Sequence, residues 1–167
     1  EMCIRDSAYI VTLGADVDAF INEWMERRPD FGVVVDAAAS AAAESAVDQV
    51  EQKIAEDLPP SQALSLPFSP GYCDWPVFEQ RKIFELLPEE AAGVRLSADA
   101  MMSPRKSISG VFGAGPVASV TQADCPCSSC ARADCAHRRR SYSGRNNEGN
   151  ANTRSIKSFR SRPAEFP

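Results

Sequence analysis

The sequence predicts an α+β fold in which N-terminal helices pack on a small antiparallel sheet, followed by a disordered C-terminal tail. Apolar residues recur at helical spacing in the first third of the chain. Short β-like runs bounded by turn residues follow residue 90, and residues 141–167 have almost no apolar pattern. The order α-α-loop-α-β-β is typical of an α+β domain with antiparallel strands.

Two long helices are predicted first. One begins near Asp16 and ends at Pro29, because five apolar residues fall at i, i+3, i+4, i+7 and i+8: Val17, Phe20, Ile21, Trp24 and Met25. The second spans about 31–57. Its first half is rich in Ala and Ser, which allows another element to approach closely, and its second half places Val47, Val50 and Ile54 on one face.

A proline-rich loop is expected over residues 58–71, and a third helix follows it. Asp74 is expected to cap this helix, with Pro76 in the first turn and Pro88 at its end. Ile83, Phe84 and Leu87 should face inward. Residues 93–96 and 107–112 are short β-like runs separated by a turn at Ser103-Pro104.

Composition and charge exclude several classes of protein. The 167 residues suit one domain, and no stretch approaches the ~18–20 unbroken apolar residues of a membrane helix. With no secretory signal pattern, the sequence predicts a cytoplasmic protein without a membrane partner. Residues 136–167 hold eight of the 18 basic residues but only two of the 23 acidic ones. An acidic body with a basic tail does not predict a nucleic-acid partner.

Four segments are expected along the chain. Residues 1–7 resemble a translated sequencing-adapter scar, so we exclude them from the fold and expect a chain truncated at its N-terminus. Residues 8–120 form the domain, 121–138 are Cys-rich, and 139–167 are a disordered basic tail.

An ordered series of short motifs resembles a known family. The series comprises FSPGYCDWP at 68–76, QRKIFELL at 80–87, GVRL at 93–96, MSP at 102–104 and SISG at 107–110. Together they resemble the activation domain of cobalamin-dependent methionine synthase, and most closely the short bacterial proteins that carry this domain. Alone, Ser-Pro-Gly-Tyr would predict only a tight turn.

The resemblance implies a function. Such a domain binds S-adenosylmethionine and supports reductive methylation of inactive cobalamin, which reactivates methionine synthase or a related corrinoid protein. It implies two partners: a cobalamin-bearing domain or chain, and a reductase that donates one electron. Catalysis would be mostly positioning, so no catalytic side chain is expected.

The resemblance also implies the binding residues. The family motif Arg-x-Ala-x-Gly-Tyr matches this sequence at Gly71 and Tyr72, with Ser69 at the small-residue position. Gly71 would let the ligand approach the backbone, and Tyr72 offers a ring and a hydroxyl. Pro67 stands at the arginine position, so the guanidinium that could grip a carboxylate there is missing.

The Cys-rich segment suggests a second chemistry. Cys125, Cys127, Cys130 and Cys135 follow a C-x-C-x2-C-x4-C spacing, and C-x2-C lets two thiolates hold one metal from a tight turn. The four could bind zinc or an iron–sulfur cluster, or remain reduced thiols on a tail, or form disulfides. The alternative function is therefore a metal-binding or iron–sulfur electron-transfer module.

Overall fold

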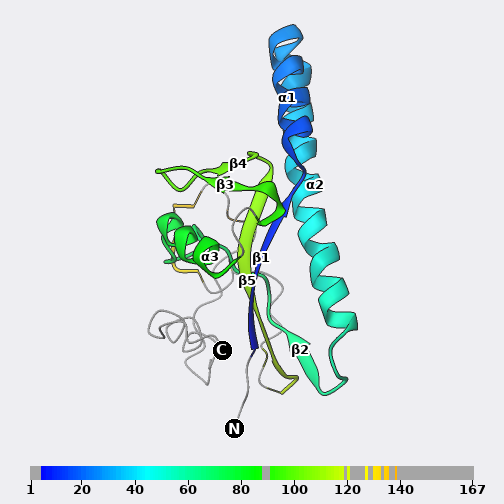
Figure 1. The fold of residues 1–167 in the computed structure, drawn as a ribbon, viewed down its shortest axis with the longest axis vertical. Helices are drawn as coiled ribbons and strands as arrows, with labels where there is room; N and C mark the ends of the chain where they lie inside the picture. Colours follow the sequence, from blue (N-terminus) through cyan, green and yellow to red (C-terminus); the bar gives the residue numbers. More distant parts are fainter. Residues whose placement is uncertain are drawn as a thin grey trace.

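The fold is α+β, as the sequence predicts. The computed structural model describes residues 5–87, 91–118, 120, 127, 130–132, 134–135 and 138. A helical hairpin runs along one side of a central three-stranded sheet and extends beyond it, and a short helix lies on the other side (Figure 1). The tail predicted to be disordered, residues 139–167, lies outside the described residues.

The central strand of the sheet is β5 (Ser107–Pro116). It pairs antiparallel with β1 (Arg5–Thr12) on one edge and with β2 (Gln62–Leu64) on the other. The sequence predicted only the first part of β5. It predicted neither β2, which lies inside the proline-rich loop, nor β1, whose residues 5–7 were excluded from the fold and pair with residues 112–114 of β5. The adapter origin of residues 1–7 stays a prediction.

The two long helices are confirmed as α1 (Ala15–Arg27) and α2 (Pro29–Glu56). Pro29 is the first residue of α2, where its missing N–H costs nothing, and the same ring stops α1 from continuing. The helices meet closely after the turn, because a Cβ built on Gly32 would lie 2.8 Å from the Met25 Cα. This tight turn produces the antiparallel hairpin of Figure 1.

One face of the sheet packs on α2 to form the hydrophobic core. Tyr9, Val47 and Phe112 are its buried centre, and five partly buried residues pack around them: Val11, Val50, Ile54, Leu64 and Ile108. The predicted apolar face of α2 is therefore confirmed. The apolar stripe of α1 is only partly core, since Ile21 is fully buried while Phe20 remains 49% exposed. Figure 1 shows that α1 lies at the end of the hairpin that extends past the sheet.

The opposite face of the sheet packs on α3 (Gln80–Leu86), which follows a 3-10 turn, η1 (Val77–Glu79). Buried Gln80 donates from Nε2 to the Ala100 carbonyl at 3.0 Å and accepts from the Ser109 hydroxyl at 3.0 Å. Ser109 follows Ile108, whose side chain faces α2, so α3 lies on the other face. The helix was predicted, but the Asp74 cap was wrong, because the first turn starts only after Pro76.

A short second sheet completes the described fold. It pairs β3 (Arg95–Leu96) with β4 (Met102–Ser103), just after the 3-10 turn η2 (Ala91–Gly93). The two β-like runs in the sequence therefore belong to different sheets. In the part of the chain that the structure describes, every helix is too short or too polar to cross a bilayer.

Candidate functional site

Residues 68–76 form a loop anchored on the central strand. The Phe68 N–H donates to the Val111 carbonyl at 3.0 Å, and the Val111 N–H donates back to the Phe68 carbonyl at 2.9 Å. Beyond this bridge, the Gly71 N–H donates to the Trp75 carbonyl at 2.8 Å. The loop therefore closes on itself and has a defined shape.

Three aromatic rings within this loop pack against one another. Phe68 stacks on buried Trp75 with centroids 5.8 Å apart and an interplanar angle of 6°. The Phe68 and Tyr72 rings meet edge to face, with centroids 5.9 Å apart and an interplanar angle of 88°. Tyr72 remains 40% exposed. The Tyr72 ring is therefore held in place while one side stays open to a ligand.

Gly71 presents bare backbone at the surface of the loop. Its φ of +96° lies in the region that favours glycine, and no atom lies within 4 Å of the position that a Cβ would occupy. The space beside it is open, so a ligand can approach the main chain there.

Ser69 points the other way. It is buried, and its side chain shares a hydrogen bond with the hydroxyl of Tyr9 in the core. Burial raises the pKa of Tyr9 to about 12. The structure thus brings Gly71 and Tyr72 to the surface together and places Ser69 beneath them as a support for the loop.

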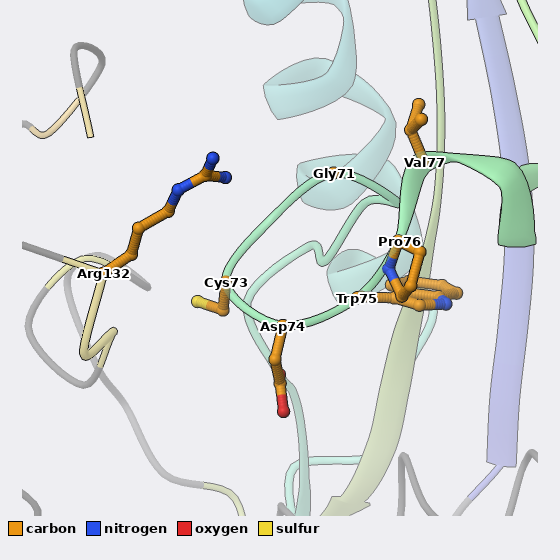
Figure 2. Close-up of a pocket in the computed structure, with 7 residues that line it drawn as sticks. All are labelled: Gly71, Cys73, Asp74, Trp75, Pro76, Val77 and Arg132. Atoms are coloured by element: carbon orange, nitrogen blue, oxygen red, sulfur yellow. The ribbon is translucent and has the colours of Figure 1, made fainter. Parts of the chain in front are cut away.

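A pocket of about 340 Å³ opens beside the loop. Six of its lining residues come from the loop and the start of η1, and the seventh is Arg132 from the Cys-rich segment: Gly71, Cys73, Asp74, Trp75, Pro76, Val77 and Arg132. Figure 2 shows the Arg132 side chain extending toward the loop from the opposite wall. Sequence reasoning missed Arg132, because nothing in its local spacing links it to residues 71–77.

Arg138 organises the described part of the Cys-rich segment. Its guanidinium donates to the carbonyls of Cys127 at 3.0 Å and Cys130 at 2.9 Å, and also to the Arg132 carbonyl. The Cys130 N–H donates to the Cys127 carbonyl at 3.4 Å, which closes a turn. The Arg138 side chain therefore binds the carbonyls at both ends of this turn and the Arg132 carbonyl that follows it.

Cys73, in the loop, is close enough to the Cys-rich segment for its pKa to be affected by that segment. Burial raises the pKa of the Cys73 thiol to about 12, with further contributions from a hydrogen bond to the Cys130 thiol and from nearby negative charge at Cys130, Asp74 and Cys127. Cys73 also adopts a φ of +52°, uncommon for a residue with a side chain. No local spacing predicts this interaction, since Cys73 lies far from the other described cysteines in the chain.

The predicted metal site stays a prediction. Cys127, Cys130 and Cys135 are partly exposed, and Cys125 lies outside the described residues. Among the residues with a described position, no three His, Cys, Asp or Glu side chains gather closely enough to hold a metal ion.

Comparison with known proteins supplies the family. A crystal structure of the MetH reactivation domain bound to AdoHcy shares the fold, with a TM-score of 0.55 and 23% identity over 67% of this chain. The match spans 40% of that chain, and the comparison with curated proteins gave no match. The family model for the activation domain of vitamin B12 dependent methionine synthase matches residues 5–124. The chain therefore belongs to this activation-domain family.

Proposed function

We propose that this protein binds S-adenosylmethionine beside the 68–76 loop and supports reductive methylation of a partner's cobalamin in the cytoplasm. The partner would be methionine synthase or a related corrinoid protein, with a reductase as electron donor. Family membership supports the proposal. The observation that carries it is the bare Gly71 backbone at the wall of a pocket, next in the loop to the exposed Tyr72.

The pocket suits a ligand of this kind. Its volume of about 340 Å³ falls within the roughly 300–1,000 Å³ of small-molecule sites. The Gly71 backbone in its wall leaves room for close approach, and the exposed ring of Tyr72 lies next to Gly71 in the loop. The related reactivation domain was solved with AdoHcy, which has the same adenosine and amino-acid parts as S-adenosylmethionine.

Arg132 would supply the charge that Pro67 lacks. A guanidinium binds a carboxylate through two parallel N–H···O bonds, and Arg132 lines the pocket opposite Gly71. We therefore assign the amino-acid carboxylate of the ligand to Arg132. Its present partner is Asp134 at 3.7 Å, in an exposed and hence weak ion pair that a ligand can displace.

For this reaction the protein has only to position the S-adenosylmethionine. S-adenosylmethionine supplies an electrophilic methyl group, and the cobalt on the partner supplies the nucleophile. No proton moves in this transfer, so no acid–base pair is needed. The residues around the pocket have to hold the ligand in one orientation and leave its methyl group facing the partner.

Calorimetric titration of S-adenosylmethionine into the full chain tests the proposal. The informative variant is Gly71→Ala, and Gly14→Ala is its matched control, because both glycines have positive φ and open space at the Cβ position. We expect the wild type and Gly14→Ala to bind, and Gly71→Ala to bind roughly tenfold more weakly, because the methyl group occupies ligand space. A folded wild type that binds neither S-adenosylmethionine nor AdoHcy would refute the proposal.

A further inference from the structure

Arg132 reaches the pocket from a part of the chain without regular secondary structure. None of the described residues of the Cys-rich segment belongs to an α-helix or a β-strand. The hydrogen bonds of a helix or a sheet therefore do not fix the Arg132 main chain, and other contacts have to do so. An exposed arginine on an unfixed main chain would lose much conformational freedom when it binds a ligand.

The Arg138 guanidinium supplies these contacts. Its Nη1 donates to the Cys127 carbonyl at 3.0 Å, and its Nη2 donates to the Cys130 carbonyl at 2.9 Å. Nη2 also donates to the main-chain carbonyl of Arg132. The Arg138 N–H donates to the Cys135 carbonyl at 3.2 Å, so the main chain of Arg138 is held in a turn of the same segment. One side chain thus bridges three main-chain carbonyls, one of which belongs to the residue that lines the pocket.

We propose that Arg138 is a positioning residue for the carboxylate of the ligand and acts through the main chain of Arg132. This inference rests on the proposed function, in which the Arg132 guanidinium binds that carboxylate. By holding the Arg132 carbonyl, Arg138 fixes the point from which the Arg132 side chain extends toward the 68–76 loop. Ordering this main chain before the ligand arrives reduces the entropy that is lost on binding.

The geometry requires an arginine rather than any cation. Two separate nitrogens of one planar group reach the three carbonyls, whereas a lysine ammonium presents its donors from a single nitrogen. The bonds to Cys127 and Cys130 are partly buried, where a charge-assisted hydrogen bond is stronger than in open water. In the described part of the segment, Arg132 is the residue that lines the pocket, so we expect Arg138 to affect the ligand through Arg132.

Calorimetric titration of the full chain with two ligands tests the proposal. S-adenosylmethionine carries the amino-acid carboxylate, and 5′-methylthioadenosine has the adenosine part without it. We expect Arg138→Gln to bind S-adenosylmethionine roughly threefold more weakly and to bind 5′-methylthioadenosine as the wild type does. A general loss of structure would weaken the binding of both ligands, so the ratio of the two affinities separates positioning from folding.

Two further variants and one control define how Arg138 acts. In Arg132→Gln the carboxylate contact is already lost, so the addition of Arg138→Gln should weaken S-adenosylmethionine binding no further. Arg138→Lys keeps the positive charge and should still bind roughly threefold more weakly, because one nitrogen cannot reach the same carbonyls. Arg105→Gln is the matched control. The Arg105 guanidinium also bonds a distant part of the chain, Asn22 Oδ1 at 2.9 Å, but does not line the pocket, so both affinities should be unchanged.

The outcomes distinguish this inference from the proposed function. A folded wild type that binds neither ligand would overturn both. A wild type that binds both ligands, with the same affinity ratio in Arg138→Gln, would overturn the positioning role alone. Wild-type affinity in Arg138→Lys would also overturn it, because the charge would then be enough without the three bonds. A further loss on adding Arg138→Gln to Arg132→Gln would show that Arg138 acts independently of Arg132, against the proposal.

Discussion

At the residue scale, Gly110 sets how closely three parts of the fold approach one another. A Cβ at this position would lie 2.5 Å from the Tyr9 hydroxyl oxygen and 2.8 Å from the Phe68 carbonyl oxygen. Gly110 pairs with Tyr9 across the sheet, and Phe68 is the anchor of the 68–76 loop. The site loop therefore reaches the central strand only because this residue has no side chain.

We predict that Gly110→Ala lowers the free energy of unfolding by about 1–3 kcal/mol, because the new methyl group overpacks the junction. Urea unfolding followed by tryptophan fluorescence measures the change. In a Tyr9→Phe background the same substitution should cost less, because the closest oxygen is gone. An unchanged midpoint in Gly110→Ala would contradict this account of the junction.

Tyr9 makes stability depend on pH in the alkaline range. Its pKa is raised by burial from about 10 to about 12 in the folded protein. Between these values the unfolded chain releases the phenol proton while the folded chain keeps it, so unfolding becomes easier as pH rises. We predict that Tyr9→Phe removes a stability loss of about 2 kcal/mol between pH 10 and 12, seen as a flatter dependence of the urea midpoint on pH. Parallel curves for the two proteins would show that Tyr9 titrates normally.

At the scale of elements, α2 depends on small residues along its buried face. Ala39 and Ala43 are 8% and 3% exposed, and Val47 continues the same face into the core one turn later. The start of β5 is tied to this helix as well, because the Lys106 ammonium lies 2.8 Å from the Asp36 carboxylate and donates to the Ser40 hydroxyl. The side-chain volume on this face therefore sets how closely α2 packs on its neighbours.

We predict that Ala43→Leu destabilises the protein by about 1–3 kcal/mol, since a larger side chain has to displace its neighbours. Ala41→Leu is the matched control, because Ala41 lies on the exposed face of the same helix. That substitution should change stability by less than about 0.5 kcal/mol. Equal effects in thermal unfolding would mean that the two faces of α2 do not differ in packing.

At the scale of the whole molecule, the candidate pocket is assembled from two distant segments. Gly71 and residues 73–77 supply one wall and Arg132 supplies another, although the family model ends at residue 124. The Cys-rich segment therefore contributes to the pocket from outside the matched domain.

We predict that Arg132→Gln weakens binding of S-adenosylmethionine about fivefold, because an exposed charge-assisted contact is lost. Arg28→Gln is the matched control, since Arg28 is likewise exposed and pairs with an acidic residue two positions on, Asp30. Calorimetry should show no change for that variant. Binding of 5′-methylthioadenosine, which has no carboxylate, should be the same in all three proteins. A normal affinity for S-adenosylmethionine in Arg132→Gln would remove Arg132 from the site.

Local patterns predicted the helices because local chemistry forms them. Pro29 both stops α1 and starts α2, and the spacing of Val47, Val50 and Ile54 requires one buried face. The strand β2 was missed because its three residues sit among prolines and are strands only through pairing with β5. The strand β1 was missed for the same reason, since residues 5–12 acquire a partner only across the sheet.

The sequence by itself determined the α+β class, the two long helices, the family, and Gly71 with Tyr72 as candidates for binding. These predictions follow from periodicity and from motifs a few residues long. Such patterns can be recognised without knowing which distant residues are in contact. The tertiary structure alone decided that Ser69 turns toward Tyr9 and that Arg132 lines the same pocket as Gly71. Each of these contacts joins residues far apart in the chain, and only the packing of the loop and the Cys-rich segment around β5 brings them together.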